Sequence, residues 1–496
     1  MNFELKTMKL SNKKLNSGSI LLQAFFFGVI SIIMIGALIS WASTNIKASR
    51  IGLYREQALQ IAEAGIDYYR WHLAHASTDF QDGTGFPGSY IHDFFDKDGV
   101  KIGTYTLDII PPAVGSTLVK IKSTGKVLID PTVSRALLVQ LAIPSLAKYA
   151  VVANDNMRFG SGTEVFGPIH SNGGIRFDGL AHNIITSAKD QYDDPDHTGN
   201  NEFGVHTHVN APPGSGTNNT FRPLEAPPSP VANRTDIFEA GRIFPTPAVD
   251  FVGLTTDLAQ IKADAQSDGK YISSSGKQGY KIVFKTDDTF DVYKVNNLIS
   301  PPSGCSSSQS GWGTWTIKTS GSGNTTFVGN YPMPVNGLIF VEDNVWVEGQ
   351  INIARVTLAA GRFPDNPSTR PNIIVNNNLL YTNYDGQDVI ALIAQGNFNA
   401  GLSSANVLRV DAALVAQNGR TGRHYYSSNC GTGYLRSSIT LYGMIASNIR
   451  YGFAYTDGTG YATRDIIYDA NLLYGPPPSF PLTTDQYQVI SWEEVK

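Results

Sequence analysis

An uncharged apolar run near the N-terminus constrains this chain more than any other feature. The run extends from Ile20 to Ala42 and contains no charged residue. As a helix it would be about 34 Å long, enough to cross a bilayer core of about 30 Å. The alternative, a cleaved secretory signal, usually has an apolar core of about 7–15 residues and a small-residue cleavage site. We therefore expect a membrane anchor.

The residues before this run predict its orientation. Lys6, Lys9, Lys13 and Lys14 precede it, together with a single acid, Glu4. Positively charged flanks remain preferentially on the cytoplasmic side of a membrane. We expect a single pass through the inner (cytoplasmic) membrane, with a basic cytoplasmic leader over 1–18 and an extracytoplasmic C-terminal domain.

The helix is expected to continue beyond the membrane. The segment from Ser43 to Ala76 contains no proline, and apolar residues recur in it at steps of three and four. That spacing produces an apolar stripe on one side of a helix. The stripe comprises Leu53, Ala58, Ile61, Ala62, Gly65, Tyr69 and Leu73. We predict one transmembrane and amphipathic helix over 19–80.

This N-terminal region resembles that of type IV prepilins, and in particular of PilX-like pilus assembly proteins. Two segments carry the resemblance, GSILLQAFFFGVISIIMIGALISWA and YREQALQIAEAGIDYYRWHL. The resemblance implies that prepilin peptidase cuts after Gly18 and leaves Ser19 as the first mature residue. Ser19 departs from major pilins, which usually have Phe there, and Gln23 stands where they have Glu.

The departure at Gln23 has a physical meaning. In the pilins that this region resembles, a buried glutamate offsets the charge of the N-terminal amine of a neighbouring subunit. That charge is otherwise costly in hydrocarbon. A neutral Gln23 cannot do so. This favours a tip or minor position, where a subunit need not join the shaft on both sides. The alternative is that Gln23 marks an uncleaved anchor.

The rest of the chain has a β-rich pattern. We expect a small pilin-like sheet packed on the helix over 86–145, a first solenoid segment over 148–180 and a parallel β-solenoid over 336–475. Apolar runs end in a polar bend with asparagine, at Asn172 in the first of the last two regions and at Asn344, Asn377, Asn397, Asn418 and Asn448 in the second. The short intervals between them fit coils of about 20 residues that stack their aliphatic residues. A β-sandwich is the alternative.

Two further regions complete the predicted organisation. An insertion over 181–335 contains a Pro-rich loop, a short helix over 249–266 and a hairpin around Asp287 and Asp288. A C-terminal cap is expected over 476–496. The region from FGPIHSNGG to YDANLLYGPPPSFP also resembles an uncharacterised domain found behind PilX-like N-termini, which brings no assigned activity or site residues.

Composition excludes some functions. The chain has 38 Lys and Arg against 42 Asp and Glu, a net charge of −4, which argues against a general nucleic-acid binder. Its two cysteines, Cys305 and Cys430, are too few for a four-thiolate zinc site, but they can form one disulfide outside the cytoplasm.

A short polar stretch contains several groups that bind metals in other proteins. They are Asp193, Asp194, Asp196, His197, His206 and His208. Two imidazoles at i and i+2 lie on one face of a strand. The spacing matches no known ligand set, however, and GNNEFG between them is typical of a flexible loop. We therefore predict a solvated polar loop, with no metal site and no cofactor.

Candidate catalytic groups are few. His170, with Ser171 and Asn172, has no carboxylate nearby in the sequence to orient it, so we interpret it as a residue at a solenoid corner. Carbohydrate-cleaving solenoids need clustered acids, and the nearest such group here sits at a bend. That group is Glu342, Asp343 and Glu348, with Asp411 alone in a strand. We predict that the chain is not an enzyme.

Together these features predict a mainly β protein with a long N-terminal α-helix. We expect a non-enzymatic, membrane-anchored minor pilin or pseudopilin-like component of a type IV pilus-like system, at the cell surface, whose head serves assembly or adhesion. Its expected partners are the membrane, other pilins or pilus assembly proteins, and surface glycans. The alternative is an anchored carbohydrate-binding or carbohydrate-cleaving solenoid. In that alternative, sugars would bind an aromatic patch formed by Trp312, Trp315, Tyr425, Tyr426, Tyr451 and Tyr455.

Overall fold

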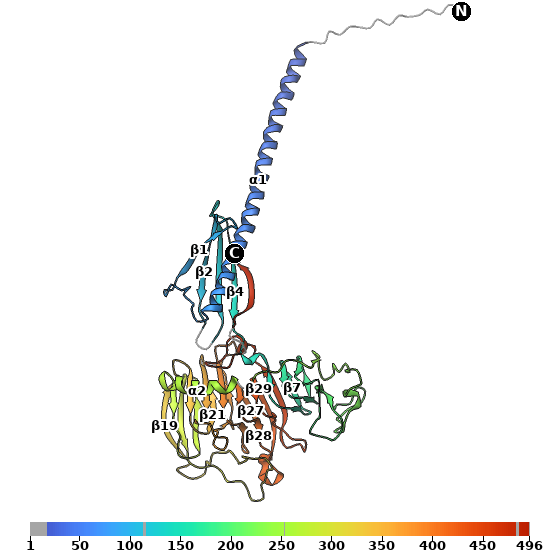
Figure 1. The fold of residues 1–496 in the computed structure, drawn as a ribbon, viewed down its shortest axis with the longest axis vertical. Coiled ribbons are helices and arrows are strands. Elements are labelled where there is room, and N and C mark those ends of the chain that lie inside the picture. Colours follow the sequence, from blue (N-terminus) through green and yellow to red (C-terminus); the bar gives the residue numbers. More distant parts are fainter. Residues whose placement is uncertain (1–16, 113–115, 252, 483–485, 496) are drawn as a thin grey trace, which may run out of the picture. The chain divides into compact units, whose positions relative to one another are not determined.

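The computed structural model describes residues 17–112, 116–251, 253–482 and 486–495, and the side chains of 17–19 and 253–257 are not described. The predicted leader therefore lies almost wholly outside the described residues. The chain divides into two compact units (Figure 1). The first holds Met1–Ile109, Ile121–Val139 and Ser491–Lys496, and the second holds Ile110–Lys120 and Gln140–Ile490.

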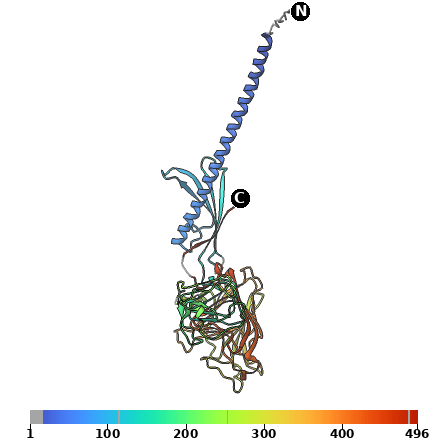
Figure 2. The same ribbon diagram turned by 90° about the vertical axis from the view of Figure 1, so that its right-hand side faces the viewer.

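The first unit is built on one long helix. Helix α1 (Ser17–His75) runs without a break, as Figures 1 and 2 show. It ends a few residues before the predicted bound of 80. The chain turns there because Asp79 accepts hydrogen bonds from the backbone N–H groups of Gln81, at 2.8 Å, and Gly83, at 2.7 Å. Such carboxylate-to-backbone bonds compete with helical ones and favour a turn.

A small sheet packs against the second half of α1. Along β3 the side chains alternate between buried and exposed, as expected for a sheet with one covered face. Its five strands are β1 (Ser89–Phe95), β2 (Lys101–Ile110), β3 (Val119–Val127), β4 (Ser134–Ala142) and β31 (Gln488–Val495), hydrogen-bonded in that order.

The apolar stripe of α1 is the helix side of this packing. Its members from Ala58 to Leu73 are buried, which confirms the predicted stripe over that part of the helix. Leu53 was predicted to belong to it and does not, since 65% of its side chain is exposed. The sheet lies close to α1 at Gly125, where a Cβ atom would lie 2.1 Å from Ala58 O.

The C-terminus differs from the predicted cap over 476–496. Its first part docks on the second unit, where Leu146 donates its backbone N–H to Pro481 O at 2.9 Å and Phe480 is buried. Its last part instead forms β31, the edge strand beside β4. Within the first unit Arg135 of β4 forms an ion pair with Glu494 of β31. Sequence alone could not show this pairing, because the two strands are far apart along the chain.

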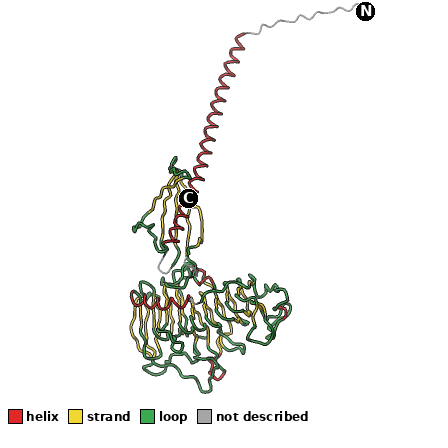
Figure 3. The backbone as a smooth tube through the Cα atoms, in the orientation of Figure 1, coloured by secondary structure: helices red, strands yellow, loops and turns green. Residues whose placement is uncertain are grey.

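The second unit contains long series of parallel strands, drawn as rows in Figure 3. In the first series each strand pairs in parallel with the next. Its members are β16 (Lys270–Ile272), β20 (Leu338–Val341), β22 (Arg355–Ala360), β25 (Val389–Ala394), β27 (Val407–Ala416), β29 (Leu435–Ser447), β5 (Val151–Ala153), β8 (Ile169–Ser171), β11 (Ile185–Ser187) and β15 (Arg242–Ile243).

Further parallel pairings accompany this series. A second series consists of β17 (Gly279–Phe284), β21 (Val345–Gln350), β23 (Ile373–Ile374), β26 (Phe398–Ala400) and β28 (Thr421–Arg423). Parallel partners also include β24 (Leu379–Leu380), β30 (Gly460–Tyr468), β7 (Thr163–Phe166) and β10 (Leu180–Ala181). A separate three-stranded parallel sheet holds β6 (Met157–Phe159), β9 (Ile175–Phe177) and β14 (Val205–His206).

The register of the first series stacks aliphatic side chains in one column. Each member is the direct partner of the next, and all lie in the largest apolar core. The column consists of Ile339, Leu358, Leu392, Leu414, Ile445, Val151, Ile169 and Ile185. Burial of such a column is the main stabilising contribution that stacked parallel strands offer.

The order of this column corrects the predicted organisation. The segment over 148–180, predicted as a first solenoid segment, follows rather than precedes the strands of 336–475 in this order, because β5 pairs directly with β29. The insertion predicted over 181–335 is likewise divided. Its first part adds β11 and β15 beyond β8 and pairs β10 with β7. Its later part adds β16 to β20 and β17 to β21, at the opposite ends of the two series.

That later part also contains the predicted helix and hairpin. Helix α2 (Gly253–Ser267) buries Leu258, Ile261 and Ala265 against Leu338 and neighbouring core residues. Strand β17 pairs antiparallel with β18 (Thr289–Val295), which pairs antiparallel with β19 (Thr325–Pro332). Short 3₁₀ helices lie at η1 (Leu146–Lys148), η2 (Pro223–Glu225), η3 (Ser428–Tyr434) and η4 (Ala470–Leu473).

Candidate functional site

The N-terminal half of α1 is one of three candidate functional regions. Among the described residues one helix is long and apolar enough to cross a membrane, with a mean hydropathy of 2.4 over its most apolar window. Its large apolar side chains, such as Phe25 and Ile32, are exposed. Gly18 and Ser19 lie in the first turn of α1, and Gln23 follows as an exposed residue. The predicted processing at Gly18 and the role of Gln23 stay predictions.

The second region is the stretch predicted to be a solvated polar loop, and that prediction is wrong. A short antiparallel pair, β12 (Gln191–Tyr192) and β13 (Glu202–Phe203), encloses the segment between them. Asp194 and Glu202 are buried, and so are His206 and His208. Burying so many polar groups is costly unless they are satisfied by one another or by a ligand.

These groups converge on one point, which we call the histidine cluster (Asp194, His197, Glu202, His206 and His208). One ligand atom each from Asp194, His197, Glu202 and His208 lie within 4.8 Å of one another. Glu202 Oε2 lies 3.0 Å from His197 Nε2 and 3.1 Å from His206 Nε2, while Glu202 Oε1 lies 3.1 Å from His208 Nε2. Asp194 Oδ2 lies 3.6 Å from His197 Nε2 and 3.5 Å from His206 Nε2.

Sequence reasoning found four members of this cluster and missed Glu202. It treated GNNEFG as a flexible linker, whereas β13 places Glu202 at the centre of the cluster. Its position four residues before His206 was the available signal. Two other acids of this stretch do not belong to the cluster: Asp193 is exposed, and Asp196 forms an ion pair with Arg450.

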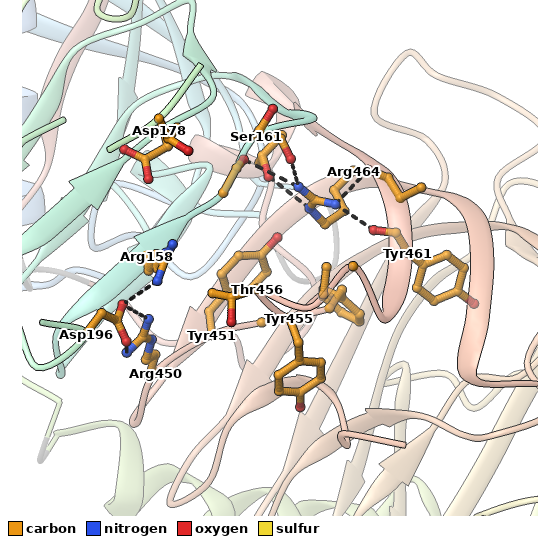
Figure 4. A pocket seen from close by; sticks show the side chains of 18 of the residues that line it. Arg158, Ser161, Asp178, Asp196, Arg450, Tyr451, Tyr455, Thr456, Tyr461 and Arg464 are labelled. Atoms are coloured by element: carbon orange, nitrogen blue, oxygen red, sulfur yellow. Dashed lines mark hydrogen bonds and ion pairs between the residues drawn. The ribbon is translucent and has the colours of Figure 1, made fainter. Parts of the chain in front are cut away.

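The third region is a pocket of about 660 Å³, shown in Figure 4. On one side Asp196 joins Arg158 Nη1 at 3.0 Å and Arg450 Nη2 at 2.6 Å. Burial raises the pKa of Asp196, but the hydrogen bond from Arg450 and the charges of both arginines lower it overall. On the other side Arg464 donates to backbone carbonyls, among them Ala462 O at 2.7 Å.

Two of the predicted patch aromatics, Tyr451 and Tyr455, line this pocket. Tyr455 donates its hydroxyl to Arg423 O at 2.6 Å, and burial raises the pKa of Tyr451 to about 12. The six residues do not form one exposed surface, since Tyr426 is buried and donates to Gly313 O at 2.8 Å. Trp315 packs against Trp346 elsewhere in the unit.

The other candidate catalytic groups are engaged in ordinary contacts. His170 is buried, with Nδ1 2.9 Å from Thr186 Oγ1 and Nε2 3.1 Å from Asn172 Oδ1. Burial lowers the pKa of His170, which keeps the ring neutral. Ser171 donates its hydroxyl to Asp155 O at 2.7 Å rather than to this imidazole.

The predicted acids are likewise bound. Glu342 pairs with Lys262 at 2.5 Å, and Glu348 pairs with Lys281 at 2.6 Å. Asp343 accepts the backbone N–H of Ser275 at 2.9 Å. Asp411 accepts from Arg409 Nε at 2.8 Å and from Tyr384 at 2.7 Å. Each carboxylate therefore has a structural partner.

The two cysteines are joined. Cys305 and Cys430 form a disulfide with a Cα–Cα distance of 4.4 Å and a sequence separation of 125. Cys430 is buried beside Leu402 and Tyr426, with Cys305 and Trp312 packed against them. The bond ties the loop before β19 to the 3₁₀ helix η3.

Comparisons with known proteins add little. No family model matches the chain, and no curated protein matches it. Among solved structures, the crystal structure of the competence-associated pilin ComZ from Thermus thermophilus is similar to it at 14% identity and a TM-score of 0.30. That match covers 89% of this chain and 97% of the other. At this score and identity the likeness does not establish a shared function.

Proposed function

We propose that this chain is a non-enzymatic, membrane-anchored, pilin-like subunit that presents a β-solenoid head outside the cytoplasm. One observation carries the proposal. Helix α1 is apolar and exposed in its first half, and its second half buries a stripe beneath a small sheet. An anchor of this kind places the first half in lipid and leaves the sheet in water.

The parallel strands of the second unit support the solenoid. Successive partners in the aliphatic column are separated by 19 residues from Ile339 to Leu358, 22 from Leu392 to Leu414, and 18 from Val151 to Ile169. Near-equal spacing between parallel partners is what a chain winding in coils produces. Longer spacings, such as 31 from Leu414 to Ile445, leave room for inserted loops.

Gln23 supports a tip or minor position in a type IV pilus-like filament. It lies in the lipid-facing part of α1 and cannot neutralise the amine of a neighbouring subunit. Gln23→Glu supplies the missing carboxylate, and we expect it to raise the share of the chain found in sheared filaments. Gln23→Asn is the matched control, and an equal share in both variants would argue against this position.

The anchor and its orientation are tested in cells that express the full chain. We expect the chain in the inner-membrane fraction, released by detergent but not by alkaline carbonate. In cells with a permeable outer envelope, added protease should digest the head and leave a cytoplasmic marker intact. A carbonate-released chain, or a head that protease does not reach, would contradict the proposal.

A second candidate function is carbohydrate binding by an anchored solenoid. The pocket beside Tyr451 and Tyr455 favours it, since aromatic faces and the arginine side chains of Arg158 and Arg450 suit sugars with acidic groups. Binding of acidic oligosaccharides to the purified chain, lost in Tyr455→Ala and kept in Tyr425→Ala, would support this candidate. Equal binding by both variants would place any sugar site elsewhere.

A further inference from the structure

The histidine cluster holds its three imidazoles in a definite orientation. Each Nδ1 faces a backbone carbonyl oxygen, at 2.6 Å for His208 and Asn218, 3.3 Å for His206 and Phe203, and 3.3 Å for His197 and Thr198. A carbonyl oxygen only accepts hydrogen bonds, so Nδ1 must carry a proton in each ring. In the neutral ring Nε2 then presents a lone pair. Carbonyl groups orient metal-binding histidines in this way.

All three Nε2 atoms point at carboxylate oxygens, which are acceptors as well. Lone pairs of Nε2 therefore face lone pairs of oxygen, at 3.0–3.1 Å from Glu202. His206 Nε2 and Asp194 Oδ2 are both buried, and neither has a hydrogen-bond partner of acceptable geometry among the described residues. A buried arrangement of this kind is stable only if protons or a cation lie between the groups.

Charge balance favours a cation over three added protons. Arg176 pairs with Asp178 at 2.8 Å and also lies 3.7 Å from Asp194 Oδ2, so the charge of Asp178 offsets that of Arg176 beside the cluster. The remaining buried charges are the carboxylates of Asp194 and Glu202. Three imidazolium groups would leave an excess of positive charge in a buried site, whereas one divalent cation between neutral rings balances the two carboxylates.

We propose that the histidine cluster binds one Zn²⁺ ion. Zinc takes imidazole nitrogen and carboxylate oxygen at about 2.0–2.2 Å, so tetrahedral ligand atoms are about 3.3 Å apart. The separations of 3.0–3.6 Å between the Nε2 atoms and the carboxylate oxygens bracket that value. Asp194, His197, Glu202 and His208 supply four ligand atoms, which lie within 4.8 Å of one another, and His206 flanks the same centre.

The burial of the site indicates a structural ion. Asp194, Glu202, His206 and His208 are all buried, and enclosed sites of this kind are structural in other proteins. The ion would fasten the stretch between β12 and β13, most of which has no regular secondary structure, to β14 and hence to the sheet of β6 and β9. This inference does not rest on the proposed function.

The test uses the full chain, purified in detergent with a tag free of histidine. Elemental analysis should find about one zinc per chain. After chelation, titration with Zn²⁺ alone should restore this content and raise Tm. Co²⁺ in its place should give the strong visible absorption bands of a tetrahedral nitrogen and oxygen site. A wild-type chain that holds no zinc, and gives Co²⁺ bands only of the octahedral aqueous ion, overturns the proposal.

Matched variants locate the ion. The double variant His206→Gln and His208→Gln should lose at least about tenfold in zinc content. The control is His182→Gln, because His182 also faces two carboxylates, Glu239 at 2.8 Å and Glu164 at 3.4 Å, but lies at the surface. Equal loss in His182→Gln, or full zinc content in a folded double variant, contradicts the assignment. If the double variant does not fold, the cobalt spectrum of the wild-type chain decides.

Discussion

Asn372 Oδ1 accepts two hydrogen bonds from Asn397, one from its backbone N–H at 2.8 Å and one from its side-chain amide at 3.0 Å. Asn344 Oδ1 accepts the corresponding pair from Asn372, at 2.9 and 3.3 Å. The three amides form a ladder across successive parallel strands. A second ladder joins Asn448, Asn154 and Asn172 through side-chain bonds of 3.0 and 2.8 Å.

Removing one amide tests the first ladder. Asn372→Ala leaves the backbone N–H of Asn397 without its acceptor, and we expect the free energy of unfolding to fall by about 1–3 kcal/mol. Urea unfolding followed by tryptophan fluorescence measures the change. The control Asn201→Ala alters an exposed asparagine and should have almost no effect. A loss no larger than that of the control would show that the ladder does not stabilise the stack.

The sequence predicted the positions of the asparagine bends more accurately than the residues to which these asparagines bond. Asn344, Asn397 and Asn448 lie in the ladders as expected for polar corners. Asn377 instead donates to Glu348 at 2.6 Å, and Asn418 donates to Gln395 O at 3.0 Å. An apolar run shows where a bend follows. The choice of neighbour depends on loop lengths that a local pattern does not contain.

Gly125 tests the packing of the small sheet on α1. A Cβ atom there would lie 2.1 Å from Ala58 O and 2.6 Å from Ala62 N. Because both are backbone atoms of a helix, they cannot move aside easily. We expect Gly125→Ala to destabilise the first unit by about 1–3 kcal/mol, detected as faster amide hydrogen exchange in β3.

Gly52→Ala is the matched control for that change. Gly52 also lies in α1, but nothing lies within 4 Å of its added Cβ. Alanine there should leave exchange in β3 unchanged and favour the helix by about 1 kcal/mol. Equal effects of the two substitutions would contradict the close packing described here.

The disulfide makes a separate prediction. It closes a loop with a sequence separation of 125, for which the chain-entropy account gives a stabilisation of about 4–5 kcal/mol. The double variant Cys305→Ser and Cys430→Ser should have a free energy of unfolding that is lower by about this amount. The change is measured as a lower urea concentration at the midpoint of unfolding. Reductant should produce the same shift in the wild-type chain and none in the variant. Two free thiols in the untreated wild-type chain would refute the bond.

His424 makes the stability depend on pH. It is buried, neither ring nitrogen has a hydrogen-bond partner among the described residues, and burial, with the charges of Arg420 and Arg423, lowers its pKa to about 4. Between the unfolded pKa of about 6.5 and this value, the unfolded chain binds a proton that the folded chain does not. Stability is therefore lost as the pH falls through that window, by about 3 kcal/mol from this group.

His424→Leu should remove this contribution. We expect its loss of stability between pH 6.5 and pH 4 to be smaller than that of the wild-type chain by about 3 kcal/mol. The control is His75→Gln, since His75 is exposed at the end of α1. Urea unfolding at several pH values, in the presence of chelator, gives the difference. Parallel pH profiles for His424→Leu and the wild-type chain would contradict the low pKa of His424.

The parts that sequence could predict are those set by local pattern. The uncharged run from Ile20 to Ala42 and the stripe from Ala58 to Leu73 each follow from residue spacing alone, and so does the hairpin of β17 and β18. Two findings depend on contacts between distant segments and carry no local signal. They are the pairing of β29 with β5 and the return of β31 to the small sheet.

The histidine cluster shows the same limit at a site. Its histidines were visible as i and i+2 neighbours, but their burial was not, because the polar stretch is enclosed by residues distant in sequence. Asp178, for example, accepts a hydrogen bond from the backbone N–H of His208 at 2.8 Å, across 30 residues of sequence. The polar composition of the stretch predicted solvent exposure, but tertiary packing buries most of the cluster.

The mature N-terminus tests the central claim most directly. Full-length mass spectrometry of the chain from native membranes should find a polypeptide that begins at Ser19, with the leader through Gly18 removed. The variant Gly18→Leu should keep the leader in the same cells, which have an active prepilin peptidase. An intact Met1 on the wild-type chain in those cells would contradict the account of a processed, pilin-like subunit.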